Sequence, residues 1–236
     1  TPSSWTGWKM EADSSLHING FPQVDSVELI TPILAGEAGV REVERVLGLV
    51  NDFGVTINRS CGNHIHHYAG DLSDKQLGVL YETYRAAQEA INFLQPKSRR
   101  NNGYCMPVAR SLAYIMGDYR SEGDALCRWV SGHSYVLNFG RYISRGTIEF
   151  RQGAGTTDFE KWHAWLVFTQ AFVTRAARVY YRRYHRIMTL DQLLRHLGFT
   201  TSSTCGVKTV PNAEFKAVRK YLKRRYKKFA PIGAAA

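Results

Sequence analysis

Apolar residues recur at helical spacing along much of the chain, which predicts several amphipathic helices. The clearest run covers residues 38–53 and is followed by Gly54, a residue suited to the left-handed conformation after a helix. A capping box at Ser73–Gln76 predicts the start of another helix, and Pro96 predicts its end. The same kinds of signal predict three further helices, over residues 157–184, 189–197 and 212–229.

Short apolar segments between these helices predict strands. The segments cover residues 5–11, 26–34, 55–65, 135–139 and 147–151. The third would form one strand or two, around a tight turn at Cys61-Gly62. Gly140 and Gly146 mark the hairpin that joins the last two. Strands and helices alternate irregularly, and several strands are separated only by short turns. This order favours an α+β fold with a mainly antiparallel sheet.

The formal net charge of +11 is concentrated in the last quarter of the sequence. Residues 1–174 hold 16 Lys and Arg against 18 Asp and Glu, whereas residues 175–236 hold 15 Lys and Arg against 2 acidic residues. A uniformly basic nucleic-acid-binding domain would not show this contrast. We therefore expect an α+β domain over residues 1–174 and a basic helical extension, packed on it, over residues 175–236. The hydrophobic content of 44% excludes intrinsic disorder.

The basic region allows two interpretations. Residues 212–229, with eight Lys and Arg, form either a solvated helix face or a docking surface for an anionic partner. That partner would be a nucleic acid, an anionic lipid headgroup or an acidic peptide. A membrane span is not expected, because the longest apolar stretch, Ala164 to Val173, is too short. Five arginines at helical spacing would extend the basic surface: Arg175, Arg178, Arg182, Arg183 and Arg186.

Two pairs of polar residues alternate on predicted strands and are the first candidates for chemistry. His64 and His66 share a strand face, which suits a divalent metal or nucleotide phosphates, although single histidines are usually structural. Glu149 and Arg151 share another face. They form either an ordinary ion pair on a sheet or a metal ligand beside a phosphate clamp. The residues alone leave both pairs open.

Two acidic residues near the start and the cysteines carry weaker signals. Glu28 lies in an apolar strand, so its carboxylate is either exposed at an edge or directed into a polar cleft. Asp13 lies in a predicted turn, where a solvated carboxylate is the default interpretation. The four cysteines form no C-x-x-C pair and are expected to be free thiols. A thiol hydrolase that uses Cys61 is a minor hypothesis, because no orienting acid is identifiable.

Six short segments occur in a recognisable order. They are Asp13–Leu16, Glu28–Leu34, Cys61–His66, Ser98–Arg99 with Tyr104–Cys105, Leu137–Phe139 and Thr147–Arg151. Together, over roughly residues 5–175, they resemble the putative amidoligase family of bacteria and phages. That family is grouped with glutamine synthetase and glutamate–cysteine ligase among the carboxylate–amine ligases. The resemblance implies a glutamine synthetase-like catalytic fold, with a curved antiparallel sheet covered by helices.

The resemblance also implies an activity. The expected enzyme is an ATP-dependent ligase that joins a peptide or amino-acid carboxylate to an amine through an acyl phosphate. Mg²⁺ or Mn²⁺ would neutralise the anionic reactants. By resemblance, Glu149 and Arg151 are the catalytic residues. The metal ligands would be Glu28, His64 and Glu149, the nucleotide and phosphate contacts would be His66, Arg99, Arg100 and Arg151, and the substrate contacts would be Asp13 and Asn138.

The chain departs from the family pattern at two places. Family members begin with a strand that carries an E-x-E pair, and nothing before Asp13 has this form. We expect that strand to be absent through truncation or loss, with Glu11 and Asp13 as a less favoured substitute. A family Arg-Tyr pair is replaced by Ser134-Tyr135, so one phosphate-binding arginine is missing or is supplied by Arg141 or Arg145.

These departures keep open a function of a different class. The alternative is a non-catalytic nucleic-acid- or virion-binding protein on a degenerate ligase scaffold. For either function we expect a cytoplasmic protein of a bacterium or of a phage-infected host. The sequence does not select the pair of substrates.

Overall fold

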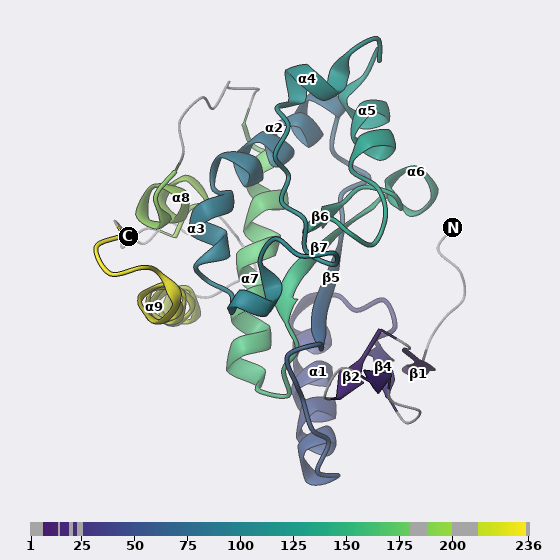
Figure 1. Cartoon of the computed structure of the whole chain (residues 1–236), viewed down its shortest axis with the longest axis vertical. Helices are drawn as coiled ribbons and strands as arrows, with labels where there is room; N and C mark the ends of the chain where they lie inside the picture. Colours follow the sequence, from purple (N-terminus) through teal and green to yellow (C-terminus); the bar gives the residue numbers. More distant parts are fainter. Residues whose placement is uncertain are drawn as a thin grey trace. The chain divides into compact units, whose positions relative to one another are not determined.

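The computed structural model describes residues 7–13, 15–18, 21–22, 26–179, 188–199 and 212–234 (Figure 1). The chain forms two compact units. The first comprises residues 1–63 and 154–163, and the second comprises residues 64–153 and 164–236. The boundary near residue 174, which rests on charge alone, stays a prediction. Three arginines named above, Arg182, Arg183 and Arg186, lie outside the described residues.

The first unit contains two small antiparallel pairs of strands and one long helix. These elements are β1 (Lys9–Ala12), β2 (His17–Ile18), β3 (Phe21–Pro22), β4 (Val27–Ile30) and α1 (Gly36–Asp52). β1 pairs with β4, and β2 pairs with β3. α1 buries Val43 and Leu47 and confirms the helix predicted over residues 38–53. The first two predicted strands are confirmed as shorter strands.

A three-stranded sheet in the order β5-β7-β6 positions the groups described below. Its strands are β5 (Gly62–Tyr68), β6 (Leu137–Asn138) and β7 (Thr147–Ala154). β5 and β7 run antiparallel, because Ala69 N donates to Gly146 O at one end and Gly155 N donates to Cys61 O at the other. The strand predicted from residue 55 begins only at Gly62, so that part of the prediction is wrong.

The second unit holds most of the helices. They are α2 (Asp74–Ala86), α3 (Gln88–Asn92), η1 (Lys97–Arg99), α4 (Leu112–Met116), α5 (Glu122–Trp129), α6 (Tyr142–Arg145), α7 (Phe159–Ala176, from residue 164 on), α8 (Leu190–His196) and α9 (Asn212–Phe229). The capping box at Ser73 is confirmed, but the helix that it starts is interrupted at Ala87. α7 ends at Ala176 rather than near residue 184. Its first turn is capped by Asp158, which accepts a hydrogen bond from Lys161 N, so the helix begins later than the predicted residue 157.

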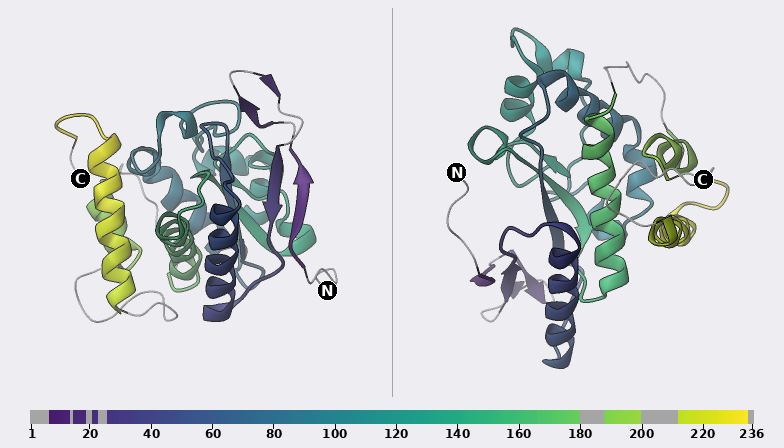
Figure 2. Two further views of the ribbon diagram at one scale, coloured as in Figure 1. Left: turned by 90° about the horizontal axis from the view of Figure 1, so that it is seen from below. Right: turned by 180° about the vertical axis from the view of Figure 1, so that it is seen from behind.

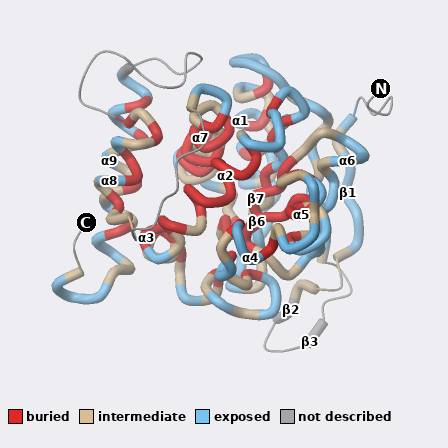
Figure 3. The backbone as a smooth tube through the Cα atoms, turned by 90° about the horizontal axis from the view of Figure 1, so that it is seen from above, coloured by how far each residue is buried: buried red, intermediate tan, exposed pale blue. Residues whose placement is uncertain are grey.

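α2 and α7 cover one face of the sheet (Figure 2). Tyr84 of α2 and Phe172 of α7 contact Phe150 of β7, with ring centroids 5.9 and 6.0 Å apart. Burial is concentrated on these helices and on β6 and β7 (Figure 3), and the same core extends to Phe215 and Leu222 of α9. The structure is therefore α+β with small antiparallel sheets. None of the described helices is both long and apolar enough to cross a bilayer.

Candidate functional site

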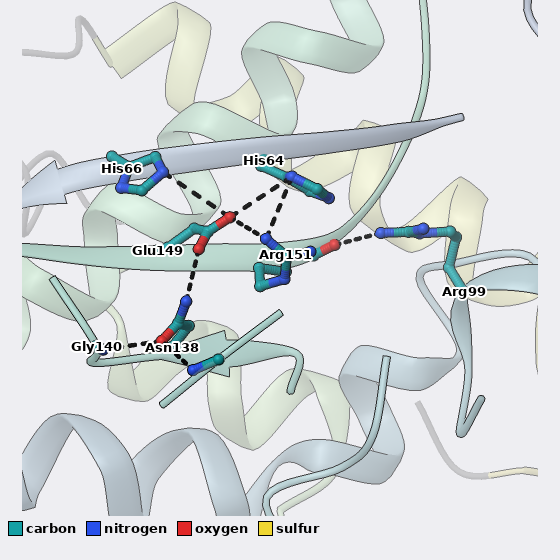
Figure 4. Close-up of polar contacts among 8 residues, drawn as sticks. His64, His66, Arg99, Asn138, Gly140, Glu149 and Arg151 are labelled. Carbon is teal, nitrogen blue, oxygen red and sulfur yellow. Dashed lines mark hydrogen bonds and ion pairs between the residues drawn. The ribbon is translucent and has the colours of Figure 1, made fainter. Parts of the chain in front are cut away.

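Four polar side chains gather on one face of the three-stranded sheet (Figure 4). β5 supplies His64 and His66, and β7 supplies Glu149 and Arg151. Glu149 Oε1 lies 3.5 Å from His64 Nδ1 and 3.8 Å from His66 Nε2. The same oxygen accepts a hydrogen bond from Arg151 Nη1, which is also 3.5 Å from His64 Nδ1. We expected these four residues and Glu28 to converge. The four do so, although their strands are more than 80 residues apart, whereas Glu28 belongs to the first unit and its part of the prediction is untested.

The alternation of side chains along each strand explains this gathering. Glu149 and Arg151 project to the polar side of β7, whereas Phe150 between them projects into the core and is fully buried. On β5, His67 also projects to the core side, where its Nε2 lies 2.8 Å from Thr169 Oγ1 of α7. The third histidine of the segment is therefore part of the packing between sheet and helix, separate from the cluster.

Asn138 of β6 fixes the carboxylate from the other side. It lies directly opposite Glu149, and its Nδ2 donates to Glu149 Oε2 at 2.8 Å. Its Oδ1 accepts hydrogen bonds from Gly140 N at 2.8 Å and from Gly132 N at 3.1 Å. These contacts favour a positioning role for Asn138. The substrate contact that the resemblance implied stays a prediction.

Arg99 approaches the cluster through the backbone of β7. Its side chain is buried, and Nη2 donates to the carbonyl oxygen of Arg151. The neighbouring Gln152 is fully buried; its Oε1 accepts from Tyr84 Oη at 2.9 Å, and its Nε2 donates to Arg99 O at 3.2 Å. Gln152 thus holds the segment that carries Arg99. Sequence reasoning missed this residue, because a single glutamine just after the predicted strand (residues 147–151) carries no periodic signal.

The electrostatics of the cluster keep both imidazoles neutral. Burial, followed by the charge of Arg151, lowers the pKa of His64 from 6.5 to about 4. Burial also lowers the pKa of His66. Burial alone would raise the pKa of Glu149, but Arg151, the two imidazoles and the Asn138 hydrogen bond together hold it below its usual value. At pH 7 the cluster therefore contains an ionised carboxylate, a guanidinium and two neutral imidazoles.

Arg151 retains an unused donor. Its side chain is about 6% exposed, and its Nε is buried without a hydrogen-bond partner among the described residues. A buried donor that lacks an acceptor is costly unless a ligand or water supplies one. This atom therefore marks a position suited to an anionic oxygen.

The described residues do not by themselves fit a metal ion. Within the described ranges, no three His, Cys, Asp or Glu side chains are arranged to hold one. In the cluster, Glu149 Oε1 already accepts from a cation, the guanidinium of Arg151. The other two possible ligands in the cluster, His64 and His66, offer imidazole nitrogens, whereas Mg²⁺ prefers oxygen ligands. The predicted roles of His64 and Glu149 as metal ligands remain untested.

Arg100, predicted to contact phosphate, is engaged elsewhere. Its Nε donates to Gln95 O at 2.8 Å, and its Nη2 donates to Phe229 O at 3.2 Å. The guanidinium also lies over the rings of Phe93 and Phe229, 5.2 and 5.8 Å from their centroids. These contacts join the segment after α3 to the end of α9. They lend no support to the predicted phosphate contact.

Two predicted residues belong to the first unit. Asp13 Oδ1 accepts hydrogen bonds from Ser15 N at 2.9 Å and Ser15 Oγ at 2.6 Å, so its carboxylate closes a local turn. Glu28 is exposed on β4, directly opposite Glu11 of β1. A strand does therefore precede Asp13 and carries one glutamate. The metal role of Glu28 and the absence of an E-x-E pair stay predictions.

Arg141, just before α6, and Arg145, at its end, are exposed, and their charges contribute to the lowered pKa of His66, after burial and the charge of Arg151. They are therefore near enough to attract an anion beside His66.

Cys61 is a free thiol whose Sγ lies 3.7 Å from Asn58 Oδ1. This contact gives the thiol hydrolase hypothesis no support.

Comparison with known proteins gives one result for the chain. A family model described as a putative amidoligase enzyme matches residues 1–173. The matched range contains every residue of the cluster on β5, β6 and β7. No curated protein and no solved structure matches the chain.

Proposed function

Because the chain belongs to the putative amidoligase enzyme family, we propose that it joins a carboxylate to an amine at the expense of ATP. The observation that supports this chemistry most directly is Arg151. Its guanidinium is held at one edge by Glu149, and its buried Nε lacks an acceptor among the described residues. A fixed guanidinium with a spare donor suits a transferring phosphoryl group or an acyl oxyanion.

The proposed reaction has two steps. A substrate carboxylate oxygen first attacks the γ-phosphorus of ATP, and ADP leaves. The amine then attacks the acyl phosphate, and inorganic phosphate leaves with that carboxylate oxygen. Negative charge develops on the phosphoryl oxygens in the first step and on the carbonyl oxygen in the second. Both charges would be met by the guanidinium of Arg151.

The other residues of the cluster have distinct proposed roles. Asn138 and Glu149 orient Arg151, since the amide fixes one carboxylate oxygen and the guanidinium occupies the other. His66 is neutral and has 48% of its side chain exposed, so it can take the proton that the attacking amine loses. Mg²⁺ or Mn²⁺ would enter with ATP and offset the charge of its phosphates. Binding of that cation by Glu28, His64 and Glu149 rests on the family resemblance alone.

Trapping of the acyl phosphate tests the proposal. The purified chain is incubated with Mg²⁺, ATP, hydroxylamine and a panel of carboxylates that includes glutamate, aspartate and short acidic peptides. We expect hydroxamate and phosphate in equal amounts with at least one carboxylate. An oxygen-18 label placed in that carboxylate should appear in the released phosphate, because the proposed first step transfers a carboxylate oxygen.

A matched pair of variants assigns the effect to the site. Arg151→Met should lower the rate by about 100-fold or more, the usual loss when a transition-state donor is removed. Arg85→Met is the control, because Arg85 also pairs with a carboxylate, Glu82 at 2.7 Å, but lies on α2. Phosphate release without hydroxamate, or without transfer of the label, contradicts a ligase. Absence of nucleotide binding would favour the non-catalytic alternative instead.

A further inference from the structure

α9 is amphipathic, and only its apolar side is buried. Phe215, Val218, Leu222 and Tyr226 are at most 6% exposed and belong to the core of the second unit. Figure 3 shows this alternation of buried and exposed residues along the helix. The helix is therefore anchored firmly, and its outer side faces away from that core.

Three exposed lysines form a row on the outer side. At 100° per residue, Lys216, Lys220 and Lys227 fall within about 40° of one another around the helix axis. With a rise of 1.5 Å per residue, the row extends over about 16 Å. We call these three residues the outer lysine row. Like charges one turn apart repel each other, so the row does not stabilise the helix.

Three other cations of α9 are already paired with a carboxylate or hydrogen-bonded. Lys223 Nζ lies 2.7 Å from Asp191 Oδ1 of α8, and Arg219 Nη2 lies 3.9 Å from the same oxygen. Arg225 Nε donates to Leu94 O at 3.1 Å. In contrast, no lysine of the outer row has an acidic partner within the part of the chain that the structure describes. The row is therefore available to an external anion.

The surroundings of the row favour one kind of polyanion. A membrane surface would require several exposed apolar residues that insert between lipids. The apolar side of α9 is buried, and Ile232, shortly after the helix, is a single exposed apolar side chain. A single-stranded nucleic acid would require exposed aromatic rings for stacking. Phe215 and Tyr226 of α9 are buried, whereas Tyr221 and Phe229 are partly exposed but have the guanidinium groups of Arg224 and Arg225 over their rings. A duplex requires neither inserted apolar residues nor stacked aromatic rings, because its phosphates are bound by charge alone. It carries one negative charge per about 1.7 Å along its axis.

We propose that the outer lysine row of α9 binds the phosphate backbone of double-stranded nucleic acid without selecting a sequence. This function is independent of the proposed ligase reaction, because none of the three lysines belongs to the cluster on the sheet. Lysine suits the role, since its ammonium acts as a compact charge that imposes no bidentate geometry.

Fluorescence anisotropy with the full chain and short labelled DNA duplexes of two unrelated sequences tests the proposal. The test variant is K216Q/K220Q/K227Q, and the control is K75Q/R120Q/R128Q. The control removes the same charge from exposed positions outside α9. We expect equal affinity of the wild-type chain for both sequences, and a steep fall in that affinity between about 50 and about 200 mM salt.

The salt dependence identifies the contacts. Each phosphate contact contributes about −0.9 to the slope of log affinity against log salt, so the test variant should have a slope shallower by about 2.7. The control should keep the wild-type slope. If the triple variant does not fold, Lys220→Gln alone should make the slope shallower by about 0.9.

Several results would overturn the proposal. They are absence of duplex binding by the wild-type chain, an unchanged slope in the test variant, and an equal loss in the control. Tighter binding to a single strand of the same length, to polyglutamate, or to phosphatidylserine-containing vesicles would also overturn it, in favour of the corresponding partner.

Discussion

Replacement of Asn138 by aspartate would test how the carboxylate of Glu149 is held. The substitution preserves shape and the oxygen that accepts from Gly140 N and Gly132 N. It replaces the amide group that donates to Glu149 Oε2 at 2.8 Å by a second carboxylate oxygen. Two like charges then face each other in a buried place, where they interact more strongly than in water.

The expected penalty follows from that distance. At 2.8 Å and an effective dielectric constant of about 20, the repulsion is about 6 kcal/mol. The chain can avoid it by protonating one carboxyl, which costs about 5 kcal/mol at pH 7.5 for a group of ordinary pKa. Since the charge of Arg151 offsets part of the repulsion when both carboxyls are ionised, we expect Asn138→Asp to lower the free energy of unfolding by about 4 kcal/mol at pH 7.5.

The pH dependence separates this charge effect from loss of packing. The carboxyl pair has a folded-state pKa above its unfolded value, so the penalty grows as pH rises and shrinks as pH falls. Between pH 7.5 and 5.5 the difference from wild type should shrink by up to about 3 kcal/mol. Asn138→Ala removes the same hydrogen bonds without adding charge. It should cost about 2–4 kcal/mol at both pH values.

Urea unfolding followed by tryptophan fluorescence measures both variants against wild type at each pH. Titration of the histidines is common to all three proteins and cancels in the differences. Parallel pH profiles for the aspartate and alanine variants would refute the reasoning. They would mean that the Glu149 carboxylate does not face position 138 in the folded protein.

The remaining predictions concern acid stability and one close backbone contact. His64 and His67 have folded-state pKa values of about 4 and about 3, below 6.5, so the unfolded chain takes up protons first as pH falls. Each should remove about 3 kcal/mol of stability between pH 6.5 and 4, and a flat profile in urea titrations would contradict this. Gly155→Ala would bring a Cβ to 2.5 Å from Cys61 Cβ and should cost about 1–3 kcal/mol. Gly48→Ala, in open space on α1, should instead stabilise by about 0.5–1 kcal/mol; equal midpoints for the two would refute the assignment.

Periodicity predicted the parts of the site that depend on strand alternation. His64 with His66 and Glu149 with Arg151 are two residues apart, so any pleated strand places each pair on one face. Alternation alone does not predict which strands are neighbours. The family resemblance predicted that the two pairs lie close together, and the structure confirms this closeness for these four residues.

Residues whose role depends on burial could not be predicted in this way. Asn138 and Gln152 act through hydrogen bonds inside the second unit, and neither differs in sequence from an exposed amide. The interruption at Ala87 has no Gly or Pro to mark it. Arg100 was grouped with Arg99 because they are adjacent, although consecutive side chains leave a turn in different directions.

The different directions of these two adjacent arginines limit how the sequence of the turn can evolve. Arg99 reaches Arg151 in the sheet, and Arg100 reaches the last carbonyl of α9, both from the short turn that starts at Lys97. The turn therefore fixes the spacing between these two contacts. Insertion or deletion of one residue before Arg99 would displace both arginines together, whereas substitution of one arginine would remove only its own contact, so we expect the length of the turn to vary less than its composition.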